Sequence, residues 1–271
     1  MKPNISEFSY GYALTDELIH WHGMTLKAAP VFPSLYAEGQ KGGGYDVRLD
    51  GPGIPLFLQF KLAHKMTRKS AMEYKRGLLQ IPFYRMHIRA SRHSDQHEML
   101  LDLENVGQEV YYTAPAFHAP QELNEAYLNH KVKDRSVWIK PSTIGVIQDD
   151  LDHHVAFRLN EAPHFCSKPR LLKSMGTLEE FQGNILRAFQ ETSHYGLKNE
   201  NLVRIASALS GIAEKHRHIS ILSRNLSRES LDDRHPLERI AFYAHVFLDC
   251  QLFIIRKKRV IRKLVGKTRS R

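Results

Sequence analysis

The sequence lacks the features that mark secreted, membrane-spanning and nucleotide-hydrolysing proteins. Cys166 and Cys250 are the two cysteines among 271 residues, too few for a disulfide framework and without the Cys/His spacing of a zinc site. No apolar run approaches about twenty residues, and the N-terminal segment has no apolar stretch before a cleavage site, so we expect neither a transmembrane helix nor secretion. A GxxxxGK[ST] motif is missing, so an energy-dependent step would need a separate motor protein. The expected location is cytoplasmic.

Positive charge is present and unevenly distributed. The net charge is +10, but residues 256–271 hold nine Lys/Arg and no acid, which leaves 30 basic and 29 acidic residues in the rest. Residues 61–92 form a second basic stretch, with nine Lys/Arg against Glu73 alone. Two such patches suit a polyanion such as nucleic acid, although a solvated face or a soluble tail would have the same composition.

The hydrophobic pattern predicts an α/β unit followed by helices. Helices are predicted over residues 12–22, 66–79 and 120–132, a hairpin over 45–62 whose second strand lies inside a sheet, and strands over 109–117, 136–144 and 153–160. From residue 178 the periodicity is helical throughout. We therefore expect an α/β domain at 1–170 and an all-helical region with a basic tail at 171–271, or helices that pack on the sheet as one unit.

The stretch GGGYDVRLDGPGIPLFLQFKLAHK, residues 42–65, carries the strongest chemical signal. Asp46 follows three glycines, which leave the backbone open to close approach, and Gln59 and Lys61 lie two residues apart on an apolar strand. Because side chains alternate along a strand, Gln59 and Lys61 are predicted to share one face. Oxygen ligands suit Mg²⁺, and phosphodiester hydrolysis needs a metal and a group that positions water.

Asp46 in GGYDVRL and the Gln59-Phe60-Lys61 triplet in LFLQFKL resemble the signature of the PD-(D/E)xK nuclease superfamily, including bacterial anti-phage defence nucleases. The resemblance implies a restriction-endonuclease-like αβββαβ core over roughly residues 5–165 and hydrolysis of DNA. Tyr45 stands where the motif name has proline, and Gln59 replaces an acid, so the site would hold metal with one less negative charge.

The resemblance also implies a role for each matching residue. Asp46, Gln59 and the main-chain carbonyl of Phe60 would ligate Mg²⁺, with Mn²⁺ as a substitute, and Lys61 would orient or activate water. Asp46, Gln59 and Lys61 are thus the predicted catalytic residues. A glutamate of the first helix, Glu7 or Glu17, would complete the metal site, and the spacing does not choose between them.

A nucleic-acid surface is predicted directly after Lys61. It comprises Lys65, Arg68, Lys69, Lys75 and Arg76. Such phosphate contacts would position a duplex without reading its sequence. We expect double-stranded DNA, although the residues do not distinguish DNA from RNA. Further expected partners are a second copy of the chain, as the resemblance implies, and a separate ATPase or sensor protein; no membrane partner is expected.

Other interpretations compete with the nuclease. Asp46 would instead cap a turn, Gln59 would be satisfied by a neighbouring strand and Lys61 would lie at a sheet edge, leaving a catalytically inactive nucleic-acid-binding or assembly subunit. Histidine clusters at 20–22, 149–154 and 215–218 lack zinc-site spacing, and Cys166 beside His164 is more typical of a buried thiol than of a nucleophile. The C-terminal segment would form a basic amphipathic helix that binds DNA, an anionic membrane surface or an acidic partner.

Overall fold

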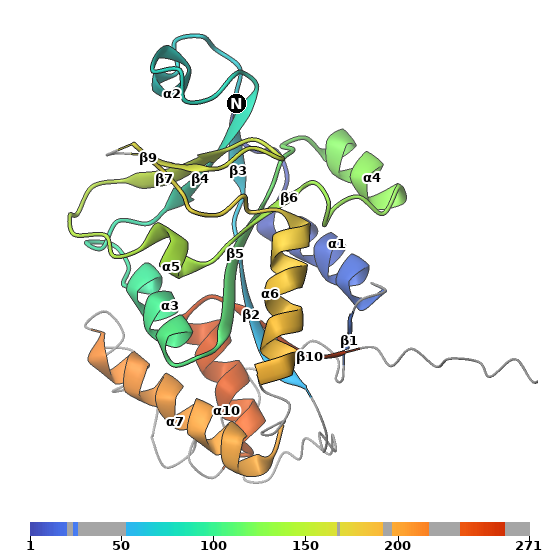
Figure 1. The fold of residues 1–271 in the computed structure, drawn as a ribbon, viewed down its shortest axis with the longest axis vertical. Coiled ribbons are helices and arrows are strands. Elements are labelled where there is room, and N and C mark those ends of the chain that lie inside the picture. Colours follow the sequence, from blue (N-terminus) through green and yellow to red (C-terminus); the bar gives the residue numbers. More distant parts are fainter. Residues whose placement is uncertain (21–23, 27–52, 167–168, 192–196, 217–233, 258–271) are drawn as a thin grey trace, which may run out of the picture.

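A computed structural model describes residues 1–20, 24–26, 53–166, 169–191, 197–216 and 234–257. These residues form a mixed α/β fold with two five-stranded sheets (Figure 1). In this part of the chain no helix combines the length and the apolar character that crossing a bilayer requires.

The first sheet, sheet A, contains the strand that carries Gln59. Its order is β1 (Met24–Leu26), β10 (Gln251–Lys257), β2 (Ile54–Phe60), β5 (Glu109–Pro115) and β6 (Ser136–Ile139). β2 and β5 are parallel, whereas the other neighbours are antiparallel. The sequence IPLFLQF is almost wholly buried, as expected for a strand that is covered on both faces. The prediction that this strand lies inside a sheet is confirmed.

The second sheet, sheet B, is antiparallel throughout. Its order is β3 (Ala63–Met66), β4 (Phe83–Ile88), β7 (His153–Phe157), β8 (His164–Cys166) and β9 (Arg170–Leu171). The chain passes from sheet A into sheet B directly after Lys61, because β3 begins two residues beyond it. The short helix α2 (Met72–Lys75) lies at the far end of this sheet (Figure 1).

Helices cover both faces of sheet A. Figure 1 shows α1 (Glu7–Ile19) and α6 (Leu178–Glu191) on one side, and α3 (Gln96–Asn105), α7 (Asn199–Lys215) and α10 (Pro236–Phe242) on the other. A π-helix, η2 (Tyr243–Phe247), continues α10 toward β10. Two further helices of the described residues are α4 (Pro120–Leu128), which has proline at its start as predicted, and α5 (Pro141–Ile144).

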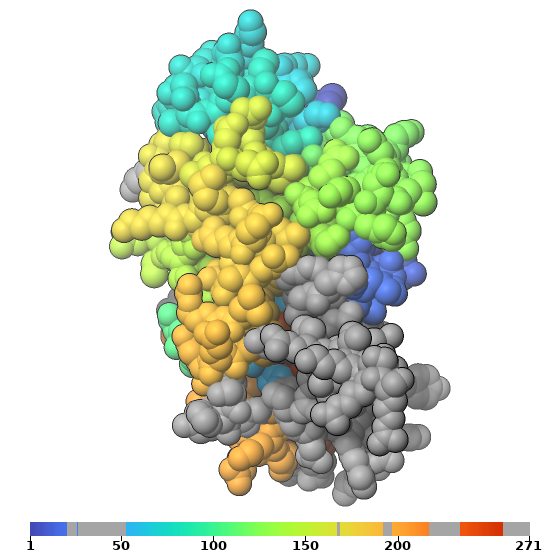
Figure 2. All heavy atoms as spheres, turned by 45° about the vertical axis from the view of Figure 1, so that its right-hand side comes forward, coloured from blue at the N-terminus to red at the C-terminus, as the bar shows by residue number. Residues whose placement is uncertain are grey.

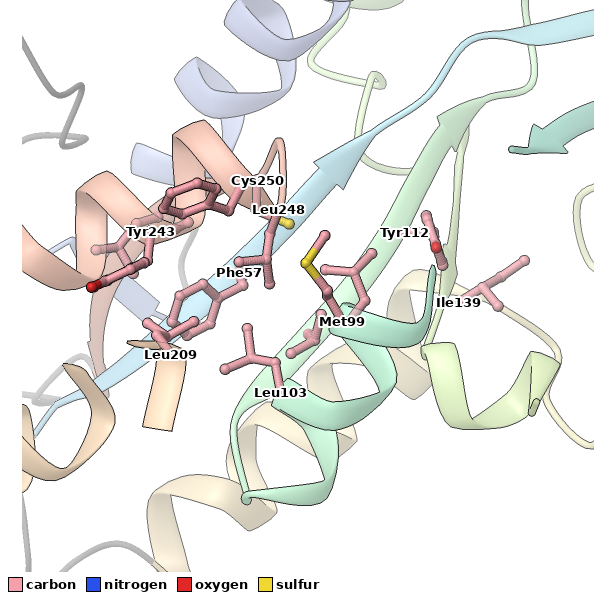
Figure 3. Close-up of a cluster of buried hydrophobic side chains, with 14 of the residues drawn as sticks. Phe57, Met99, Leu103, Tyr112, Ile139, Leu209, Tyr243, Leu248 and Cys250 are labelled. Atoms are coloured by element: carbon pink, nitrogen blue, oxygen red, sulfur yellow. The ribbon is translucent and has the colours of Figure 1, made fainter. Parts of the chain in front are cut away.

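The larger hydrophobic core lies between sheet A and the helices α3, α7 and α10. Phe57 of β2, Leu103 of α3, Leu209 of α7 and Leu248 after η2 lie together in it (Figure 3). This cluster therefore takes residues from both sides of the predicted boundary at residue 170. Burial of such side chains is the main stabilising term for the arrangement.

Four sequence predictions need correction. The strand predicted over residues 136–144 ends at Ile139, because Pro141 begins the helix α5. Region 171–271 is not all-helical, because residues 251–257 form β10 and pair with β2. β2 is bordered by β10 and β5, so the pairing expected from a hairpin over residues 45–62 is wrong; residues 45–52 themselves lie outside the described residues. The basic helix predicted over residues 66–79 is reduced to the four residues of α2.

Candidate active site

β2 delivers Gln59 and Lys61 to one face of sheet A. Gln59 is 1% exposed and Lys61 is 7% exposed, and both side chains reach Gln96 at the start of α3. Phe60 lies on the opposite face, where its ring meets the edge of the Tyr10 ring of α1 at 5.9 Å between centroids. The prediction that Gln59 and Lys61 share a face is confirmed.

Gln96 joins the two side chains through hydrogen bonds of defined direction. Lys61 Nζ donates to Gln96 Oε1 at 2.9 Å, and Gln96 Nε2 donates to Gln59 Oε1 at 2.9 Å and to the carbonyl of Leu248 at 3.0 Å. A lysine ammonium only donates and a carbonyl only accepts. The Gln96 amide can therefore have only one orientation, with its oxygen toward Lys61 and its nitrogen toward the carbonyl of Leu248.

The orientation of Gln59 follows from that of Gln96. With Oε1 accepting from Gln96, the Gln59 nitrogen Nε2 faces the carbonyl of Phe60 at 3.1 Å and Asp249 Oδ2 at 3.4 Å. Gln59 thus offers a hydrogen-bond donor at this place, whereas a ligand of Mg²⁺ must offer an oxygen. Two oxygens, from Phe60 and Asp249, converge on its amide nitrogen.

The electrostatic state of Lys61 is unusual for a lysine. Burial lowers the pKa of its ammonium, and the negative charges of Glu7 and Asp249 counteract this only in part. Its side-chain hydrogen bond goes to a neutral amide oxygen. A desolvated lysine with a lowered pKa is one that can exchange a proton closer to neutral pH, which is the property that catalytic lysines share.

Asp249, like Gln96, is not predicted from the sequence as a site residue. It lies two residues before β10, and the register of Gln251 against Leu58 places it beside the end of β2. Asp249 is exposed, and its backbone has φ +53°, in the left-handed region that non-glycine residues rarely adopt. In the sequence this aspartate lies within a helical pattern, so no signal connected it with Gln59. We call Gln59, Lys61, Gln96 and Asp249 the β2-end cluster.

The β2-end cluster borders a cavity of about 460 Å³ between α1, the end of β2 and the turn before β10. Glu7, Asp16 and Asp249 are the carboxylates that line it. Glu17 does not, because its carboxylate accepts hydrogen bonds from the backbone N–H groups of Val132 and Lys133 at 2.8 and 3.0 Å. Of the two predicted helix glutamates, Glu7 is therefore the one beside Gln59.

The other predicted site residues have different placements. Asp46 lies outside the described residues. Lys65 is bound to Glu122 Oε1 at 2.8 Å, an interaction that raises its pKa. The other four residues of the predicted nucleic-acid surface are exposed, namely Arg68, Lys69, Lys75 and Arg76. They belong to the segment around α2, coloured teal, which forms the tip of the molecule in Figure 2.

A second polar cluster lies where α2 meets sheet B. Glu73 receives two hydrogen bonds from Arg85, one of 2.8 Å from Nε, and one of 2.7 Å from His154 Nε2. Cys166 completes a group of three potential metal ligands with Glu73 and His154, whose ligand atoms lie within 4.8 Å of one another. The guanidinium already occupies both carboxylate oxygens, so a cation would have to displace it. We call these four residues the α2 cluster.

The α2 cluster also accounts for two weaker sequence signals. Cys166 is buried in β8, and burial raises the pKa of its thiol to about 11, as expected for an unreactive cysteine. Within 149–154, His153 contacts Asp149 at 2.7 Å while His154 turns to Glu73, so the two neighbouring histidines point to different partners. Trp21, His22 and residues 217–218 of the other histidine clusters lie outside the described residues.

No protein-family model, curated protein or solved structure matches this chain.

Proposed function

We propose that the protein is a metal-dependent nuclease that hydrolyses phosphodiester bonds of DNA at the β2-end cluster. The observation that carries the proposal is the buried Lys61, held by Gln96 beside Gln59 and next to the exposed carboxylate of Asp249. A lysine with a lowered pKa and a carboxylate at the rim of a cavity are the groups that this hydrolysis requires.

One part of the fold around the cluster supports the proposal. α1 precedes β2 in the chain, and β2, α3 and β5 form a parallel strand-helix-strand unit with Lys61 at the end of its first strand. From the motif of Asp46, Gln59 and Lys61 we propose a PD-(D/E)xK nuclease with a role in bacterial anti-phage defence or restriction.

The oxygen donors around Gln59 suit Mg²⁺ or Mn²⁺. Asp249, Glu7 and the Phe60 carbonyl would hold the ion together with Asp46, and when bound the ion would polarise the phosphate and supply a nucleophile at neutral pH. Lys61 would hold or take up the proton of the attacking water. Gln96 would keep the Lys61 ammonium at its place by its 2.9 Å hydrogen bond.

The glutamine at position 59 has a physical explanation in this proposal. Its nitrogen lies 3.4 Å from Asp249 Oδ2, so a glutamate there would set two negative charges against each other. The charge that the motif loses at Gln59 is returned by Asp249 from the turn before β10. Gln59 then acts as the donor that orients Asp249 and not as a metal ligand itself.

A second candidate function is a catalytically inactive nucleic-acid-binding or assembly subunit. The observation that favours it is the group of exposed basic residues around α2, which is the surface that a binding module needs and which requires no catalytic group. Binding to double-stranded DNA, dimerisation and action with a separate ATPase or sensor protein belong to both proposals.

The test is cleavage of plasmid and single-stranded DNA in Mg²⁺, Mn²⁺ or EDTA, with binding measured in parallel. Wild type is compared with Lys61→Met, Asp46→Asn and the control Lys131→Met, which removes a lysine that is 62% exposed. We expect metal-dependent cleavage that both site variants lose and the control keeps, while all four proteins bind DNA. Binding with no cleavage by the wild type would support the inactive subunit.

A further inference from the structure

One face of α1 presents large apolar side chains to solvent beside the β2-end cluster. Phe8 is 78% exposed and Tyr12 is 64% exposed, and Ile19 is exposed farther along the same helix. Their spacing of four and seven residues places them on one side of the helix. All three line the 460 Å³ cavity that Gln59 and Asp249 also border. The helix thus forms an aromatic wall next to the candidate catalytic groups.

Phe60 and a glycine of α1 also line the cavity. A Cβ atom on Gly11 would lie 2.8 Å from the Phe60 ring, so the small residue lets this ring lie against the helix. The volume of the cavity lies in the range of pockets that bind small organic groups. A flat aromatic group in the cavity would therefore meet the exposed aromatic side chains of α1 and the ring of Phe60.

The charges of the cavity decide which part of a nucleic acid can enter it. Glu7, Asp16 and Asp249 contribute carboxylates, and the described residues that line the cavity include neither lysine nor arginine. Away from the ion that Glu7 and Asp249 would hold, the described lining offers no lysine or arginine to a phosphate, whereas a nucleobase is uncharged and planar. Stacking of bases on exposed aromatic side chains is also tolerant of sequence, since every base has a π face.

We infer that the cavity binds an unpaired nucleobase of the strand that the β2-end cluster cuts, with Tyr12 and Phe8 as the stacking surface. The inference rests on the proposed function and narrows its substrate. In a duplex the bases are paired and stacked, so an unpaired base is most readily supplied by single-stranded DNA or by a strand end that has separated. The inference therefore favours these substrates over the intact duplex that the sequence alone led us to expect.

The experiment measures binding of the full chain in a Lys61→Met background, which prevents cleavage. The probes are labelled oligothymidylate, an abasic strand of the same length and a duplex with the same number of phosphates, all in Mg²⁺. Tyr12→Ala, Tyr12→Leu and Phe8→Ala test the wall, and Tyr12→Phe keeps the aromatic ring. Leu128→Ala, which removes an exposed apolar side chain of α4, is the matched control.

We expect oligothymidylate to bind at least about tenfold more tightly than the abasic strand or the duplex. Tyr12→Ala, Tyr12→Leu and Phe8→Ala should each weaken oligothymidylate binding about tenfold and leave abasic binding unchanged, while Tyr12→Phe and Leu128→Ala bind as the parent does. Equal binding of the three probes, or no effect of the Tyr12 and Phe8 variants, would overturn the inference. Thymidine monophosphate binding as tightly as the oligomer would overturn it too, because the cavity would then be a small-ligand site.

The outcomes separate this inference from the nuclease proposal. Lys61-dependent cleavage with equal binding by the Tyr12 variants would retain the nuclease and remove the base pocket. Base-dependent binding through Tyr12, without cleavage by the wild type, would retain the pocket and remove the nuclease.

Discussion

The β2-end cluster and the α2 cluster solve the burial of a charged group in opposite ways. In the α2 cluster, Glu73 accepts hydrogen bonds from Arg85 and His154. Burial alone would raise the pKa of Glu73, but these hydrogen bonds outweigh burial and lower the pKa to about 2. In the β2-end cluster, Lys61 is met by the neutral amide of Gln96, and burial lowers its pKa. The α2 cluster thus stabilises the ionised form of Glu73, whereas the β2-end cluster destabilises the ionised form of Lys61.

The largest effect expected is on cleavage, from Lys61→Met. Loss of a group that transfers or positions a proton should reduce the rate about 10²- to 10⁴-fold. The free energy of unfolding should change by no more than about 1 kcal/mol, because removal of a buried ammonium offsets the hydrogen bond that Gln96 loses. Single-turnover cleavage and urea unfolding measure the two quantities. A large loss of stability with cleavage intact would give Lys61 a structural role.

Glu73→Gln should reduce stability and leave cleavage unchanged, which is the opposite of the result expected for Lys61→Met. This change leaves Arg85 without its carboxylate, and breaking a buried pair in this way costs about 3–5 kcal/mol of unfolding free energy. Cleavage by the folded fraction should be unchanged. The control Glu161→Gln removes a more exposed partner, that of Arg158, and should cost less than about 1 kcal/mol. Equal costs for the two variants would show that burial adds nothing to the Glu73 pair.

Lowering the pH should reduce the free energy of unfolding, because it protonates the carboxylate of Glu73. Because the pKa of Glu73 is lowered from 4.5 to about 2, its contribution is complete above pH 4.5 and is lost as the pH falls toward 2. Of a total of about 3 kcal/mol, about 2 kcal/mol should be lost by pH 3. Urea unfolding from pH 6 to pH 3 measures this, and the slope should be shallower in Glu73→Gln. An identical slope in both proteins would contradict the assignment.

The smallest effect concerns the relation between Gln59 and Asp249. Asp249→Asn removes a carboxylate and should weaken Mn²⁺ binding about tenfold, since affinity follows the charge of the ligands. Adding Gln59→Glu returns a carboxylate to the same place, facing an uncharged asparagine, and should recover most of the affinity. Calorimetric titration of the single and double variants measures this. No recovery in the double variant would mean that the two positions are not interchangeable.

The sequence predicted the local features of the site and not its assembly. The apolar run of β2 and the alternation of Gln59 and Lys61 are properties of one short segment, and both were correct. Gln96 and Asp249 come from segments 37 and 190 residues from Gln59, so only the tertiary fold brings them together. β10 was predicted as helix, because the apolar residues of this strand also fit the helical period that runs through residues 236–257.

Mn²⁺ binding tests most directly which of the two clusters is the chemical centre. Free Mn²⁺ would be followed by electron paramagnetic resonance as metal is titrated into wild type, Asp249→Asn, Asp46→Asn and Glu73→Gln. The account predicts that the wild type and Glu73→Gln bind the ion alike, and that both aspartate variants bind it more weakly. Binding that survives in the aspartate variants and is lost in Glu73→Gln would place the metal at the α2 cluster and contradict the account.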